Sequence, residues 1–158
     1  MKRSTFAGLL AALFVFGTTL CASPAQALTV QLTPSGAEPN AAGQATIDTI
    51  SYRGKSFAPY GNAWFYSYSG NLTVTCQGLT PGATYWTSAG TVKAAQDGTL
   101  HASVKNWSFF YKFIFTSTRP NLTGYWVYPI VLVSRVNSDG SCTVVLAAQL
   151  PLLPRPGM

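Results

Sequence analysis

The chain has 158 residues and few charges: 10 Lys and Arg, 4 Asp and Glu, and one His, a net charge of +6. Its basic residues are dispersed, and without a basic run a nucleic acid is a poor partner. Hydrophobic residues make up 47% of the sequence, which is enough for the core of one domain. Because Glu and Lys, two good helix formers, are scarce, the composition disfavours a helical protein.

The first residues have the parts of a secretory signal peptide. Lys2 and Arg3 form a basic start, residues 6–16 are apolar, and an Ala-Gln-Ala cleavage pattern ends the segment. A lipid-anchored start at Cys21 is disfavoured because a bulky leucine precedes it. We predict that residues 1–27 are removed and that the rest, with 8 basic and 4 acidic residues, is exported to the periplasm or outside the cell without stable membrane insertion.

Alternation of apolar and polar residues predicts strands through the rest of the chain. Residues 28–32 show the period of a half-buried strand. The same pattern predicts further strands over residues 45–52, 64–68, 72–76, 85–95, 100–105, 107–116, 126–134 and 142–149. Residues 34–43 and 53–62, rich in Gly and Pro, are predicted loops, and the proline-rich residues 150–158 a mobile tail.

Short β-runs separated by turn signals predict an all-β fold, and one turn has a more specific pattern. Leu79, Pro81 and Tyr85 resemble the tyrosine corner of fibronectin type III and related immunoglobulin-like domains. The resemblance implies an antiparallel immunoglobulin-like β-sandwich of about eight strands over residues 28–149. It also implies that Tyr85 is buried, with its hydroxyl bonded to the backbone near Leu79 or Thr80. It implies no activity.

Two cysteines remain after loss of the signal peptide. Cys76 and Cys142 both lie in alternating apolar runs, in phase with residues expected to face the core. Free thiols are uncommon in an oxidising compartment, and an even number of cysteines in an exported domain usually forms bridges. We predict a disulfide between them, which requires their strands to lie side by side or face to face.

The titratable residues do not form a catalytic or metal-binding pattern. General acid–base catalysis needs two such groups close together, and His101 falls on the polar face of its predicted strand. The four carboxylates lie in predicted turns or on an outward strand position: Glu38, Asp48, Asp97 and Asp139. No cysteine and histidine spacing fits zinc, and no loop fits calcium. We expect a protein that is not an enzyme and has neither a metal nor a cofactor.

Aromatic residues are the better candidates for function. Five of them share one face of a predicted strand: Trp107, Phe109, Tyr111, Phe113 and Phe115. Each such ring buries about 150–250 Å² in a core, so we expect this face to be the inner face of the fold. The alternative is an exposed platform that stacks on sugar rings.

The predicted loop over residues 53–62 offers a second set of aromatic residues. Arg53, Phe57 and Tyr60, with Trp64 just beyond, are expected to be exposed, and Trp86 is expected to face away from the core beside the corner. We predict an exported, non-catalytic module that acts by surface contact with a protein or the cell envelope. The alternative is a carbohydrate-binding module that uses these loop aromatics.

Overall fold

The computed structural model describes residues 26–117 and 123–154, and this part of the chain is built from strands. They are β1 (Gln26–Pro34), β2 (Ala42–Ala58), β3 (Ala63–Gln77), β4 (Thr84–Thr87), β5 (Gly90–Lys93), β6 (Leu100–Phe115), β7 (Gly124–Val127), β8 (Ile130–Val136) and β9 (Cys142–Gln149). A single 3-10 turn, η1 (Pro59–Gly61), joins β2 to β3. The prediction of an all-β fold is confirmed.

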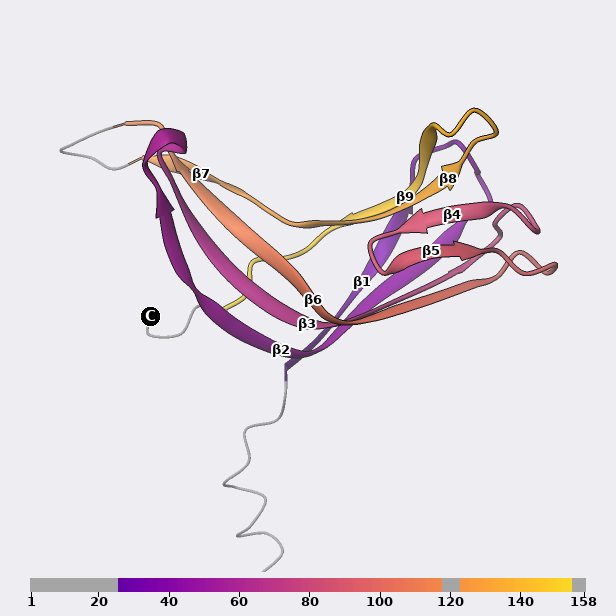
Figure 1. Ribbon diagram of the computed structural model, residues 1–158, viewed down its shortest axis with the longest axis horizontal. Helices are drawn as coiled ribbons and strands as arrows, with labels where there is room; N and C mark the ends of the chain where they lie inside the picture. Colours follow the sequence, from indigo (N-terminus) through magenta and orange to yellow (C-terminus); the bar gives the residue numbers. More distant parts are fainter. Residues whose placement is uncertain (1–25, 118–122, 155–158) are drawn as a thin grey trace, which may run out of the picture.

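The nine strands form one sheet in the order β5-β4-β8-β9-β1-β2-β3-β6-β7, and every neighbouring pair is antiparallel. Strand β1 joins the two halves of this sheet. Its residues 26–32 pair with β2, whereas Thr33 and Pro34 pair with β9. Figure 1 shows that the sheet curls strongly, so that β4, β5, β8 and β9 stand over one end of the long strands β2, β3 and β6.

The core lies where the sheet curls over itself. Its walls are Ile47, Leu72 and Val74 from the long strands and Val131, Val133 and Leu146 from β8 and β9; Leu72 and Ile47 have no exposed surface. The alternation of β2 and β3 puts these side chains on one face, because successive residues of a strand point to opposite faces. Burial of such aliphatic side chains contributes about 1.5–3 kcal/mol each.

Beyond the core, the long strands continue as an arm, which we define as residues 51–58 of β2, 63–70 of β3, 107–115 of β6, and β7. Bulges separate the arm from the core: the register shifts between Asp48 and Ser51 of β2 and between Gly70 and Leu72 of β3. Thr49 and Asn106 have positive φ angles of 53° and 54° at this point. Bulges bend and twist strands, which explains the curvature of the arm in Figure 1.

The arm corrects the prediction of a loop over residues 53–62. Most of this segment is strand: β2 extends to Ala58, and only Pro59 to Asn62 turn the chain into β3. Its Gly and Pro residues suggested a loop, but Gly54, at a φ of 140°, belongs to a bulge inside the strand, where the register shifts after Tyr52. The segment still carries exposed side chains, but on a sheet and not on a flexible connection.

Several other strand boundaries also differ from the prediction. The runs over residues 64–68 and 72–76 are one strand, β3, and those over 100–105 and 107–116 are one strand, β6. Conversely, residues 85–95 contain the hairpin of β4 and β5, in which Thr87 pairs with Gly90. Residues 126–134 span the end of β7 and most of β8, since Pro129 has no backbone N–H to continue a ladder.

The predicted disulfide is wrong, because Cys76 and Cys142 are both free. Cys76 is buried on β3, whereas Cys142 is exposed at the start of β9, and β1 and β2 lie between these two strands. A bulge in the β8–β9 ladder explains the misplaced Cys142: Val133 pairs with Leu146, but Ser134 pairs with Val144. The extra residue reverses the alternation, so Leu146 faces the core and Cys142 faces away from it.

The ends of the chain differ in how far the structure describes them. The predicted signal peptide lies outside the described residues except for Gln26 and Ala27, which begin β1. The predicted mobile tail is wrong for its first residues. Leu150 and Leu153 are buried, and the Leu150 N–H donates to the Pro129 carbonyl. Within the described ranges, no helix has the length and apolar character to cross a bilayer.

Candidate functional site

The corner between β3 and β4 is built as the sequence predicts. Tyr85 is fully buried, and the backbone N–H of Thr80 donates to its hydroxyl oxygen at 3.0 Å. That hydrogen bond ties the start of β4 to the turn before it, five residues upstream, and confirms the prediction. The same hydroxyl donates to Glu38 at 2.8 Å from Oε1 and 2.9 Å from Oε2, a contact that the sequence did not indicate.

Glu38 lies at the centre of a buried polar network. Its Oε1 accepts from the backbone N–H and the side-chain hydroxyl of Thr80, and Arg135 of β8 lies 3.6 Å from it. Burial, and the hydrogen bond to the Glu38 carboxylate, raise the pKa of the Tyr85 hydroxyl. A buried carboxylate with this many donors holds together the connection between β1 and β2, the corner before β4, and β8. The network is structural, since its members already satisfy one another.

The aromatic strand β6 divides into a buried and a half-exposed part. Phe109 and Tyr111 are 3% and 1% exposed, so the expectation that this face is the inner face is confirmed for them. Tyr111 donates its hydroxyl proton to the Pro151 carbonyl at 2.6 Å, which holds the C-terminal segment over them. Trp107, Phe113 and Phe115 are only half buried. The inner face therefore continues out of the core as a row of rings along the arm.

Half-buried rings of β3, β6 and β7 surround a pocket of about 320 Å³ on the inner face of the arm, which we call the arm pocket. It is lined by Lys55 of β2, Trp64 and Tyr66 of β3, Phe113 and Phe115 of β6, and Trp126 of β7. Ladder pairing brings them together, because Phe57, Trp64, Phe113 and Trp126 face one another in register across four strands. Lys55 pairs with Tyr66 in the next row.

The rings of the arm pocket contact one another in tilted and edge-to-face pairs. Trp126 lies 5.0 Å from Phe113 and 5.4 Å from Tyr66, with planes inclined at 59° and 48°. Phe113 and Phe115 meet edge to face at 5.2 Å. Tilted and edge-to-face contacts are the preferred arrangements of aromatic pairs. These contacts join the rings of three neighbouring strands into one wall.

A positive charge sits over two of these rings. The Lys55 ammonium lies 4.0 Å from the centroid of the Trp64 ring and 5.4 Å from that of Tyr66. Both distances are within the range in which the π face of a ring attracts a cation. None of the six residues that line the arm pocket is acidic, so the cation is held there by rings and not by a carboxylate.

The structure brings only some of the predicted binding residues together. Trp64 lines the arm pocket, and Phe57, 45% exposed, contacts it as a tilted ring pair with centroids 4.9 Å apart. Tyr60 is fully exposed at the tip of the arm. Arg53 points to the outer face, where its Nε–H donates to the Ser69 hydroxyl at 2.6 Å. Trp86 is 45% exposed, as expected, but it lies on β4, far from the arm in the strand order.

Sequence reasoning missed Tyr66 and Trp126 of the arm pocket, and it placed Lys55 near Trp64 only as part of a loop. Trp126 was part of an apolar run that reads as a core strand, and Tyr66 was not singled out. Lys55 should share a face with Arg53 if β2 alternates regularly. The bulge at Arg53 reverses this, so that Tyr52, opposite Tyr68, and Lys55, opposite Tyr66, share the inner face. Trp64 and Phe113 could be recognised as neighbours only once β3 and β6 were known to pair.

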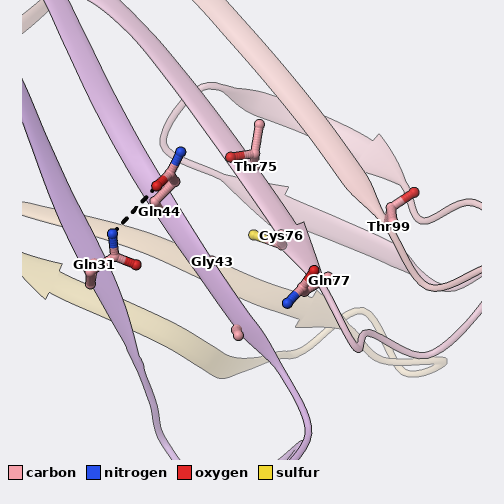
Figure 2. A pocket seen from close by; sticks show the side chains of 8 residues that line it. Gln31, Gly43, Gln44, Thr75, Cys76, Gln77 and Thr99 are labelled. Atoms are coloured by element: carbon pink, nitrogen blue, oxygen red, sulfur yellow. Dashed lines mark hydrogen bonds between the residues drawn. The ribbon is translucent and has the colours of Figure 1, made fainter.

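A second pocket, also of about 320 Å³, opens beside β1, β2 and β3, and Figure 2 shows its lining. The Gln31 amide donates to the Gln44 side-chain oxygen at 3.4 Å, and Thr75 follows on the next strand. The thiol of Cys76 also lines this pocket, but burial raises its pKa to about 11, so it stays protonated at neutral pH. A neutral thiol is a weak nucleophile, and no histidine or carboxylate lines the pocket to activate it.

The remaining titratable residues are dispersed over the surface. His101 is exposed on β6, as expected, opposite Thr75. Asp97 and Asp139 accept hydrogen bonds from Thr99 and Ser141 within their own turns, and these bonds lower the pKa of both carboxyl groups. Among the described residues, no group of three Asp, Glu, His or Cys side chains could hold a metal ion.

Comparison with protein-family models, curated proteins and solved structures finds no significant match to this chain.

Proposed function

We propose that this protein is an exported, non-catalytic binding module that contacts a component of the cell envelope through the arm pocket. One observation carries the proposal: five half-buried aromatic rings from three strands line a single open pocket. Rings of this size are normally buried in a core of their own or against a partner. Such a pocket, mostly aromatic with one charged group, is typical of a ligand site.

The chemistry of the described residues supports a binding role over catalysis. The arm pocket holds a lysine but no carboxylate, histidine, serine or cysteine that could act as base or nucleophile. Export is supported by the sequence alone, through the basic start, apolar run and Ala-Gln-Ala pattern. An exported module meets the cell envelope, and its net positive charge attracts it to negatively charged envelope components.

Carbohydrate binding is the second candidate, and a specific observation favours it. Phe57, Trp64, Phe113 and Trp126 lie in register across four adjacent strands and present their rings on one open face. A row of rings one strand apart could stack on successive sugar units. Phe57 at 45% exposure would be the outer end of such a row.

Co-sedimentation with envelope material tests the proposed function. Purified mature protein should sediment with isolated envelopes, and the double variant Trp64→Ala, Trp126→Ala should stay in the supernatant. Phe110→Ala is the matched control, since Phe110 is a 53% exposed ring on the opposite face of β6. Equal sedimentation of all three proteins would contradict a role for the arm pocket. Retention on a polysaccharide column, lost in the double variant alone, would favour the carbohydrate candidate.

We also propose that the corner reflects an immunoglobulin-like origin of the half of the sheet that forms the core. The support is the bond between Thr80 and Tyr85 and the packing of β8 and β9 over β2 and β3. The continuous nine-strand order is not that of two separate sheets. An experimental structure in which Thr33 and Pro34 do not pair with β9, so that β1 pairs only with β2, would support the sandwich form.

A further inference from the structure

We propose that the arm pocket is an aromatic cage for a quaternary ammonium group, and that its ligand is choline phosphate. The proposal rests on the proposed function and names the chemistry that the arm pocket recognises. The protein's own Lys55 ammonium already occupies the position that such a cation would take, 4.0 Å from the Trp64 centroid. The structure thus shows a cation held by ring faces within the pocket.

The rings select a cation of a particular kind. A quaternary ammonium has no N–H groups to satisfy, so it loses little when carbon and π faces replace its water. A lysine ammonium, by contrast, is strongly hydrated and leaves its hydrogen bonds partly unmade among rings. Cages of several aromatic rings are used to recognise choline and methylated lysine for this reason. The faces of Trp64, Tyr66 and Trp126 give the arm pocket the required walls.

Lys55 determines what must accompany the cation. Its side chain is exposed and long, so the ammonium leaves the arm pocket without unfolding β2. Choline alone would then lie next to the positive charge of Lys55, since none of the described residues that line the arm pocket is acidic. Choline phosphate removes this conflict, because its phosphate pairs with the displaced ammonium. A zwitterion of this order, cation inward and phosphate outward, matches the arm pocket.

Titration with choline chloride and with free phosphocholine tests the proposal, with tryptophan fluorescence and NMR shifts of ring protons as readouts. Phosphocholine should bind saturably and about fivefold more tightly than choline, given the charge of Lys55. Trp64→Ala should weaken phosphocholine about tenfold. Trp64→Phe, which keeps a ring, should weaken it less, and Phe110→Ala should have no effect.

Lys55→Gln separates the two parts of the ligand. The variant vacates the cage, so choline should bind more tightly than to the wild type, while the preference for phosphocholine disappears. Unchanged choline binding and an unchanged preference would overturn the assignment of Lys55 and the proposal with it. The variant alters one exposed side chain of a strand, so its folding is readily verified by circular dichroism.

Vesicles distinguish the sources of choline phosphate. Binding to phosphatidylcholine vesicles but not to phosphatidylglycerol vesicles would assign a lipid headgroup, and binding to soluble phosphocholine alone would assign a free or polymer-borne group. Binding to neither choline compound, together with Trp64-dependent sedimentation with envelopes, would overturn this inference and leave the proposed function standing. If the protein binds neither choline compound and its sedimentation with envelopes does not depend on Trp64, the proposed function is overturned as well.

Discussion

At the scale of single residues, the sequence predicted contacts only where a short segment determines them. Tyr85 and Thr80 are five residues apart, and the turn between them makes their hydrogen bond a local property. Glu38 completes the same network from 47 residues away, and its position beside Tyr85 depends on how β1 and β2 cross the corner. No local pattern distinguishes this buried carboxylate from an exposed one in a glycine-rich turn.

The corner gives a prediction for Tyr85→Phe. Loss of the hydroxyl removes a donor to Glu38 and one of the two acceptors of the Thr80 N–H, beside a Tyr85 ring that has no exposed surface. We expect the free energy of unfolding, measured with urea, to fall by about 1–3 kcal/mol. Tyr60→Phe is the control, because Tyr60 is fully exposed at the tip of the arm and should leave stability unchanged. Equal stabilities of the two variants would mean that the network contributes nothing.

At the scale of strands, alternation predicted the existence of β-structure better than its length. Strand β6 was expected as two runs, because Lys105 and Asn106 interrupt the apolar pattern, and Asn106 does have a positive φ. The ladder with β3 continues on both sides of this bulge, so 16 residues form one element. Bulges at Arg53 and in β9 shifted the phase of alternation, which moved Lys55 to the inner face and Cys142 to the outer face. A period-two pattern contains no sign of such an insertion.

The two parts of β6 give a second prediction. Phe109 is 3% exposed and stacks on Tyr68 in the core, so Phe109→Ala should lower the free energy of unfolding by about 3–5 kcal/mol. Phe113 has a similar ring but is half buried in the arm pocket, so Phe113→Ala should cost clearly less. Chemical denaturation of both variants measures the difference. A larger loss for Phe113→Ala would place the folding core in the arm and contradict its role as an open site.

At the scale of the whole molecule, the strand order could not be predicted from the sequence. Hairpins such as β8–β9 follow from turn residues, whereas β1 lies between β2 and β9 only because its last two residues change partner. The arm pocket depends on this scale too, since its six residues come from four strands. The sequence indicated aromatic residues as candidates for binding, Trp64 among them, but that some of them line one pocket became clear only from the register of β2, β3, β6 and β7.

The strand order also gives a prediction about the thiols. Because β1 and β2 separate β3 from β9, Cys76 and Cys142 should remain unlinked even in an oxidising medium. A thiol reagent at pH 8 should modify the exposed Cys142 in the native protein within the mixing time. Cys76, buried and with a pKa of about 11, should react only after unfolding.

Counting the thiols provides the measurement. The native mature protein, which lacks Cys21, should show one reactive group, and the unfolded, unreduced mature protein should show two. The Cys142→Ser variant should show no reactive group in the native state and one after unfolding. Two reactive groups in the native protein would mean that the end of β3 opens readily, despite its pairing with β2 and β6. No reactive group in the unfolded, unreduced protein would show a disulfide. Such a bridge requires Cα atoms within about 7 Å, which is closer than the spacing of about 10 Å at which sheet faces pack, so the outward placement of the exposed Cys142 on β9 would then be wrong.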